Sequence, residues 1–350
     1  MSTLFILGNG FDIDLGFNTR FSDYINSVHF KGNNNDILGL KHNSNRNELI
    51  DIANHLESIA KTDLWFDLEK EIVNYYKNLI NPLRSGIYSK SENEKINEKL
   101  KIHKQHVIPV IKKSISNFLM TEVNSKYNNY KIPQNENSKS AILLRKMLIE
   151  IIVRNSSKII TFNYTGDEVL KNELKKLIPV DYKKNIDNNK IIKIHGNISS
   201  ANNRDNLVFG STDTDINDEN IATFLDKTRQ PSIESGFWSK QFFESFKTFV
   251  IFGHSLGETD SYFFKNLIDH FIEYKRIQGK EVFIYTSENG REAIISKIKE
   301  KYSSYSELTS NTKIKFNDEN FLNDKLVNTS YIEAFQAKEP FIRTNDVPKS

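Results

Sequence analysis

The feature that most constrains the fold is a buried strand followed at once by a glycine turn, close to the start of the chain. Residues 4–7 form a continuous apolar run, a pattern typical of a strand that is buried on both faces. Gly8-Asn9-Gly10 follows, and residues 11–27 can open as a helix. The two glycines permit positive φ and close approach of a ligand. Strand, glycine turn and helix together predict that backbone N–H groups and a helix dipole receive a phosphate.

A simpler interpretation of this turn stays open. The third glycine of the dinucleotide-binding fingerprint is absent, because Ile13 stands in its place. A tight turn at the end of a buried strand would produce the same pattern without binding anything.

Three later segments have the same form, an apolar strand that ends in small and polar residues. They cover residues 158–165, 191–197 and 248–260. In open parallel sheets, ligands bind beyond the carboxyl ends of the strands. The four strand ends therefore predict one site built from distant parts of the chain.

The order of the patterns indicates the fold class. Residues 31–140 show apolar residues mostly at helical spacing, whereas strands and helices alternate after residue 141. This alternation predicts an α/β, Rossmann-like fold with a mainly parallel sheet, helices on both faces and a large helical insertion after the first strand. The units expected are a core of residues 1–30 and 141–325, a helical insertion of 31–140 and a C-terminal tail of 326–350.

Several individual elements are also predicted. A break is expected over residues 82–91, and a long helix over 92–124 that Pro109 kinks or divides. A short strand is expected over 207–210, and helices over 167–177 and 221–249.

Composition excludes several classes of site and partner. The net charge of +3 gives no overall case for nucleic acid binding, although a local basic patch stays open. Absence of cysteine removes disulfides, thiol catalysis and cysteine-based metal sites, and the eight histidines show no zinc spacing, so no metal is expected. No apolar run approaches the ~18 residues of a membrane span, and no signal peptide is evident, so we expect a cytoplasmic protein without a membrane partner.

Five motifs in order resemble the bacteriophage abortive infection AbiH family. They are ILGNGFDIDLG over residues 6–16, WFDLE over 65–69, ITFNYT over 160–165, IHG over 194–196 and FGHSLGETD over 252–260. They run through about three quarters of the chain. The resemblance implies a bacterial protein of phage defence, and it does not give a reaction.

The same series is more distantly similar to sirtuin-like NAD-binding domains. That resemblance implies NAD as ligand or substrate and cleavage of the nicotinamide–ribose bond, as in an NAD glycohydrolase. It also implies Asn163 as the residue that orients water or ribose and His195 as the base. Two departures are Thr165, where the sirtuin motif has Asp, and Asn9, where the glycine turn has alanine. Without cysteine there is no zinc module, so protein deacylation is not expected.

The candidate site residues carry suitable chemistry. An amide such as Asn163 can place a water, and the imidazole of His195 can accept a proton near neutral pH. A turn-forming Asn163 and a strand-capping His195 are the structural alternatives. On the helical insertion, Glu69 is the better polar candidate of its motif. The residues expected to surround the nucleotide are Gly8, Asn9, Gly10, Asp12, Thr161, Gly253, Ser255 and Asp260.

Two other functions remain open at this point. Residues 253–257 also fit the Gly-x-Ser-x-Gly pattern of a serine hydrolase with Ser255 as nucleophile, but the only histidine downstream is His270. Alternatively, the protein is a non-enzymatic nucleotide sensor that contacts a phage or host protein. The partners expected are thus a nucleotide and a protein trigger, and homo-oligomerisation stays open.

Overall fold

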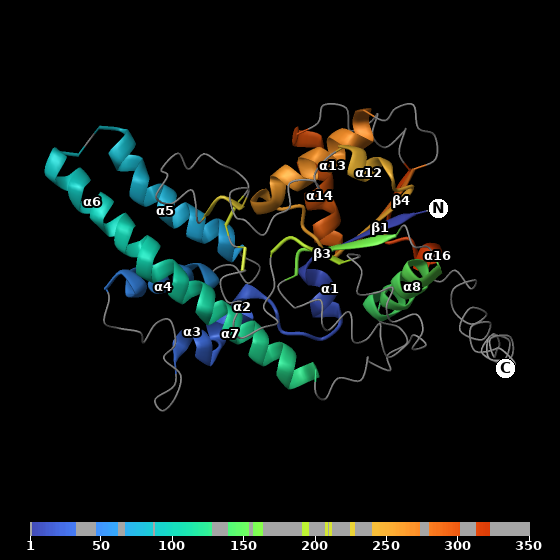
Figure 1. Cartoon of the computed structure of the whole chain (residues 1–350), viewed down its shortest axis with the longest axis horizontal. Helices are drawn as coiled ribbons and strands as arrows, with labels where there is room; N and C mark the ends of the chain where they lie inside the picture. The colour runs from blue at the N-terminus through green and yellow to red at the C-terminus, as the bar shows by residue number, and fades with distance from the viewer. Residues whose placement is uncertain are drawn as a thin grey trace, which may run out of the picture.

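The computed structural model describes residues 2–32, 47–61, 67–86, 88–127, 139–153, 157–163, 191–195, 207–208, 210–211, 225–227, 240–273, 280–301 and 313–322. In this part of the chain, parallel strands form one six-stranded sheet in the order β3-β2-β1-β4-β5-β6 (Figure 1). The strands are β1 (Thr3–Leu7), β2 (Lys158–Thr161), β3 (Ile191–Lys193), β4 (Thr248–Phe252), β5 (Glu281–Tyr285) and β6 (Lys313–Phe316).

The strand order places the predicted site at a topological switch point. From β1 the chain adds β2 and β3 on one side of the sheet, then returns to add β4, β5 and β6 on the other. The last residue of β1, Leu7, is in register with Thr161 of β2 and with Phe252 of β4. The carboxyl ends of these strands therefore lie at one edge of the sheet, the edge at which open α/β sheets bind their ligands.

Alternating side chains of the strands make two hydrophobic layers, one on each face of the sheet. Leu4 and Ile6 of β1 pack into the layer covered by α12 (Lys240–Glu244), α13 (Ser261–Glu273) and α14 (Glu288–Lys301). Phe5 and Leu7 pack into the layer covered by α1 (Asn9–Asp14), α8 (Lys139–Val153) and α16 (Glu319–Leu322). Figure 1 shows these two groups of helices on opposite sides of the strands. The predicted α/β fold with helices on both faces is confirmed.

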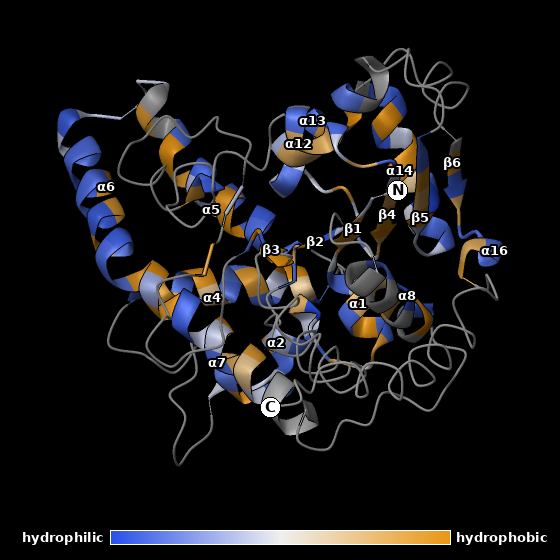
Figure 2. Cartoon of the chain, turned by 45° about the vertical axis from the view of Figure 1, so that its right-hand side comes forward, coloured by the Kyte–Doolittle hydropathy of each residue, from blue (hydrophilic) through white to orange (hydrophobic). Residues whose placement is uncertain are grey.

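The helices between β1 and α8 have a hydrophobic cluster of their own. They are α2 (Phe21–Asn26), α3 (Val28–Lys31), α4 (Asn47–Ala60), α5 (Leu68–Arg84), α6 (Lys90–Ile102) and α7 (Ile108–Tyr127), with a π-helical turn over His103–Val107. Their cluster already includes Tyr24 and Ile25, so helical packing begins before residue 31. Figure 2 shows that α6 is largely hydrophilic where it leaves this cluster. The division into core, insertion and tail stays a prediction.

Of the two breaks predicted at prolines, one begins later than expected, and the other divides the long helix beside Pro109 as predicted. The break expected from Pro82 begins later, because α5 continues to Arg84 and only residues 85–89 separate it from α6. The irregularity expected at Pro109 lies just before it, as the π-helical turn of His103–Val107. Proline has no N–H to donate to the carbonyl four residues earlier, so the preceding turn can widen without losing a hydrogen bond.

Several other predicted elements fall wholly or partly outside the residues that the structure describes. The strand expected over 207–210 is absent from the described residues of that segment, and the neighbouring Ser211 forms an isolated bridge with Asp226. The helix expected over 167–177, most of the one over 221–249, and the tail lie outside the described residues. None of the described helices combines the length and hydropathy that a membrane crossing requires.

A buried histidine makes the helical insertion sensitive to acid. His103 is fully buried, and its Nδ1 lies 3.0 Å from the Tyr76 hydroxyl. Burial, and then nearby Lys99, lower the pKa of His103 from 6.5 to about 4. The unfolded chain therefore binds more protons between these two values, and the free energy of unfolding falls as pH drops from about 6.5 towards 4.

We expect His103→Phe to remove this decrease in the free energy of unfolding with falling pH, which amounts to at most about 3 kcal/mol. Urea unfolding at a series of pH values measures it. The control is His106→Phe, at an exposed position in the same turn. Its free energy of unfolding should depend on pH as steeply as that of the wild type. Equal slopes in all three proteins would contradict the assignment to His103.

Candidate functional site

The glycine turn after β1 packs directly against the turn after β4. The N–H groups of Gly8 and Gly10 donate to the carbonyls of Phe252 and Gly253 at 2.8 and 2.9 Å. A Cβ on Gly10 would lie 2.6 Å from the Gly253 Cα. Both glycines are therefore required by close approach of two backbone segments.

This arrangement corrects the sequence interpretation of the glycine turn. Gly8 has an extended φ of −108°, and the positive φ of this region is found at Gly253, at +63°. The N–H groups of Gly8 and Gly10 are already paired with protein carbonyls, contrary to the prediction that they receive a phosphate. The helix that follows, α1, has only 6 residues, so its dipole is small.

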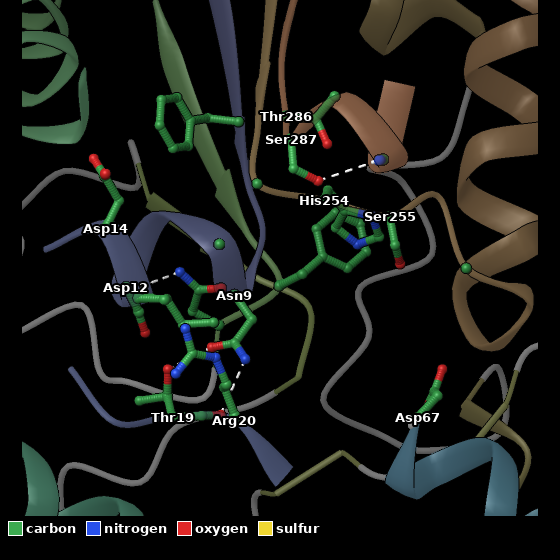
Figure 3. Close-up of a pocket in the computed structure, with 18 of the residues that line it drawn as sticks. Asn9, Asp12, Asp14, Thr19, Arg20, Asp67, His254, Ser255, Thr286 and Ser287 are labelled. Atoms are coloured by element: carbon green, nitrogen blue, oxygen red, sulfur yellow. Dashed lines mark hydrogen bonds between the residues drawn. The ribbon is translucent and has the colours of Figure 1, made fainter. Parts of the chain in front are cut away.

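A cavity of about 750 Å³ opens beyond the carboxyl ends of the strands (Figure 3). This volume lies within the range that small-molecule and cofactor sites occupy. Of the predicted site residues, Gly8 and Thr161 do not line the cavity. Those that do are Asn9, Gly10, Asp12, Asn163, His195, Gly253, Ser255 and Asp260.

Asn163 is held at the end of β2 by two contacts. Its backbone N–H donates to the Thr161 hydroxyl at 3.1 Å, and its Nδ2 donates to the Asp12 carboxylate at 2.8 Å. Asn163 is only 5% exposed, and its Oδ1 has no hydrogen-bond partner among the described residues. A buried amide oxygen without a protein partner is suited to accept from a ligand hydroxyl, an amide or a water.

Asn9 supports the cavity wall through the loop after α1. Its Nδ2 donates to the Thr19 carbonyl at 3.0 Å, and its Oδ1 accepts from the Thr19 hydroxyl at 2.5 Å. This loop brings Arg20 to the cavity wall, where it adds a guanidinium group to the lining (Figure 3). Asp14, by contrast, accepts from the backbone N–H of Ser140 at 2.7 Å, at the start of α8.

The densest group of charges surrounds Lys227, a residue that sequence analysis did not single out. Its Nζ lies 2.7 Å from Glu69 Oε2, 2.9 Å from Asp260 Oδ1 and 2.9 Å from His195 Nε2. The His195 Nε2 is also 3.1 Å from Asp260 Oδ1. Lys227 is fully buried. These side chains come from α5, the end of β3, the residues after β4 and an isolated segment, so the cluster joins the helical insertion to the sheet.

Short backbone pairings place Lys227. The N–H of Lys227 donates to the Ser211 carbonyl at 3.0 Å, and the N–H of Ser211 donates to the Leu225 carbonyl at 2.7 Å. The N–H of Gly210 donates to the second carboxylate oxygen of Glu69 at 3.3 Å. Val208 donates in turn to the carbonyl of His195 at 3.0 Å. The same segments thus align Glu69, Lys227 and His195.

Burial and opposite charges set the ionisation of this cluster. Burial alone would lower the pKa of Lys227, but the carboxylates of Asp260 and Glu69 raise it above its ordinary value. Burial alone would raise the pKa of Asp260, but Lys227 and His195 hold it well below its usual range. The pKa of Glu69 is raised, chiefly because burial outweighs the attraction of Lys227. Two carboxyl groups therefore surround one ammonium group, which leaves an excess of acidic groups beside the cavity.

His254, from the turn after β4, is a second histidine beside Asp260. The N–H of Leu256 donates to its Nδ1 at 2.9 Å, so that nitrogen is an acceptor and neutral His254 carries its proton on Nε2. Nε2 lies 3.6 Å from Asp260 Oδ2. Burial lowers the pKa of His254, which favours the neutral ring.

The geometry around Ser255 does not support the serine hydrolase alternative. No described histidine forms a hydrogen bond with the Ser255 hydroxyl. His270 packs on Phe249 of β4 and contacts Lys280, just before β5, so it lies towards the amino ends of the strands. Ser255 follows β4 at the opposite end. The positive φ of 50° falls on Leu256, not on the serine as in a nucleophile elbow.

No group of three or more acidic, histidine or cysteine side chains in the described residues could hold a metal ion. The described side chains that line the cavity carry amides, imidazoles, carboxylates, hydroxyl groups, an ammonium group and the guanidinium group of Arg20.

The comparisons with known proteins decide the family. The family model described as bacteriophage abortive infection AbiH matches residues 4–284. The chain belongs to the AbiH family. Membership implies a role in abortive infection, the bacterial response to phage, and this match confirms the resemblance seen in the five motifs. No curated protein and no solved structure matches this AbiH chain.

The site of this AbiH protein includes residues that the sequence indicated and others that it did not. Asn163, His195 and Asp260 lie together, and Glu69 joins them from α5. Lys227 and His254 were not predicted as site residues. Lys227 gives no local signal, because a single lysine within the helix predicted over 221–249 is expected to be exposed to solvent. His254 could have been found, because it lies in the glycine-containing turn that already contributed Gly253 and Ser255.

Proposed function

We propose that this AbiH protein binds NAD or a related nucleotide in the cavity and hydrolyses the bond between nicotinamide and ribose. The observation that carries the proposal is the buried amide of Asn163. It is held by Asp12, lacks a described partner for Oδ1, and shares one cavity with His195. Such an amide can position a water or a ribose hydroxyl.

In the proposed reaction, a water oxygen forms a bond to C1′ of the ribose while the bond from C1′ to the nicotinamide nitrogen breaks. The electron pair of that bond neutralises the cationic ring, and the proton of the water passes to His195 and then to solvent. The transition state resembles an oxocarbenium ion. The Asp12 carboxylate and the acidic excess around Lys227 would stabilise its positive charge.

Replacement of Asn163 or His195 is the test of this reaction. We expect Asn163→Ala and His195→Ala each to reduce nicotinamide release by about 10²–10³-fold, the usual effect of losing a positioned donor, acceptor or base. Liquid chromatography of nicotinamide and ADP-ribose measures release. The matched control is Asn317→Ala, which removes an amide from another part of the cavity wall. Turnover that survives in both Asn163→Ala and His195→Ala would refute their roles.

A nucleotide sensor without turnover is the second candidate, and one observation favours it. The Nε2 atom of His195 already lies between Lys227 and Asp260, so it is not available to a water. A sensor would bind NAD or ADP-ribose in calorimetry without releasing nicotinamide. Both candidates suit a phage or host protein that acts as a trigger, and both place the nucleotide in the same cavity.

A further inference from the structure

The atoms around His195 Nε2 limit where its proton can be. Lys227 Nζ lies 2.9 Å from this nitrogen, and Asp260 Oδ1 lies 3.1 Å from it. An ammonium group has only donors, so a short contact with Lys227 requires a lone pair on Nε2. A protonated Nε2 could donate to Asp260, but its N–H would then face the ammonium group at 2.9 Å, among side chains that are all buried.

The arrangement with Lys227 as donor gives each N–H bond of the ammonium group an acceptor. The three N–H bonds of Lys227 then point to Glu69 Oε2, Asp260 Oδ1 and His195 Nε2, at 2.7, 2.9 and 2.9 Å. The neutral ring of His195 carries its proton on Nδ1 in this state. The lone pair that a general base needs is consequently occupied by Lys227.

We propose that Lys227 is a positioning residue that keeps Nε2 of His195 as an acceptor, and that Glu69 on α5 holds Lys227 in this position. The helical insertion thereby controls the proton on the site histidine. Since Asp67 at the start of α5 also accepts from Thr259, next to Asp260, at 3.1 Å, movement of α5 would disturb both partners of His195 together. The inference rests on the proposed function only for its consequence, which is that hydrolysis requires Lys227 to release His195.

Nitrogen NMR of the full chain tests this directly. The protein is labelled with ¹⁵N-histidine, and His195→Gln identifies the two signals of this residue among the eight histidines. At mildly alkaline pH, wild-type Nε2 should give the signal of an unprotonated ring nitrogen and Nδ1 that of a protonated one. In Lys227→Met/Glu69→Gln, Nε2 should become protonated, because among the described residues Asp260 is then the charged group that contacts it. The double variant removes one carboxylate together with the ammonium, which protects folding.

Lys280→Met is the matched control. Lys280 Nζ lies 2.7 Å from Nε2 of His270, so the same lysine–histidine contact occurs far from the cavity. This variant should shift the signals of His270 and leave those of His195 unchanged. A protonated Nε2 of His195 in the wild type, or an unprotonated one in the double variant, overturns the proposal.

The same samples separate this inference from the proposed function. Failure of the wild type and of every variant to release nicotinamide would remove the hydrolysis but not the role of Lys227, which the NMR signals decide alone. Conversely, nicotinamide release by a wild type whose Nε2 is protonated would retain the hydrolysis and remove the positioning role.

Discussion

Lys227→Met is expected to lower the free energy of unfolding by about 3–5 kcal/mol, the usual cost of breaking a buried ion pair from one side. The reason is that Glu69 and Asp260 would remain buried without their shared ammonium group. Urea denaturation measures the loss. Adding Glu69→Gln should recover part of it, so the two substitutions should be non-additive by about 1–3 kcal/mol.

Lys315→Met provides the control for this experiment. Lys315 also lies between two carboxylates, 3.6 Å from Glu281 and 3.6 Å from Asp318, but its side chain is 42% exposed. Ion pairs of this kind contribute about 0–1 kcal/mol. A Lys227→Met protein as stable as Lys315→Met would show that the buried cluster does not hold the insertion to the sheet.

Gly253→Ala is expected to be the most damaging of the small substitutions, with a loss of about 4 kcal/mol in the free energy of unfolding. The φ of Gly253 is +63°, and an added Cβ would lie 2.5 Å from the Gly10 Cα and 2.5 Å from the Phe11 backbone nitrogen. Backbone atoms cannot yield as a flexible side chain can. The turns after β1 and β4 would therefore separate, and the cavity that both turns line would change shape.

Gly86→Ala is the control that separates backbone strain from the contact between the two turns. Gly86 has nearly the same φ, +65°, but no atom of the described residues lies within 4 Å of an added Cβ. We expect this variant to cost about 1–2 kcal/mol, the strain of the left-handed conformation alone. Thermal unfolding of both variants measures the difference. Equal losses would mean that the packing of the two turns contributes nothing.

The sheet could be predicted because each strand is a continuous apolar run that ends in glycine or polar residues. The runs before Gly8, Asn163, His195 and Gly253 place four strand ends at one edge by topology alone. The register in which β1 pairs with β2 and β4 then brings Leu7 beside Thr161 and Phe252. The carboxyl-edge position of the site follows from this alternation and needs no side-chain detail.

The contacts within the site could not be predicted in the same way. Gly8 and Gly10 were interpreted through a ligand, but their partner is the backbone of residues 252 and 253. That packing depends on a chain separation of more than 240 residues, which no local pattern records. Lys227 likewise acquires its role only when α5 and the segments after β3 and β4 meet around it. The net charge of the sequence does not reveal a single buried lysine.

Calorimetric titration with NAD tests the central claim most directly, because it asks whether the cavity binds a nucleotide irrespective of turnover. Ser255→Trp should place an indole in the cavity from an exposed position of its wall, and Ser58→Trp adds the same group to an exposed site on α4. We predict that the wild type and Ser58→Trp bind NAD or ADP-ribose and that Ser255→Trp does not. Binding that is equal in all three proteins, or absent from the wild type, would contradict a nucleotide site at the carboxyl edge of the sheet.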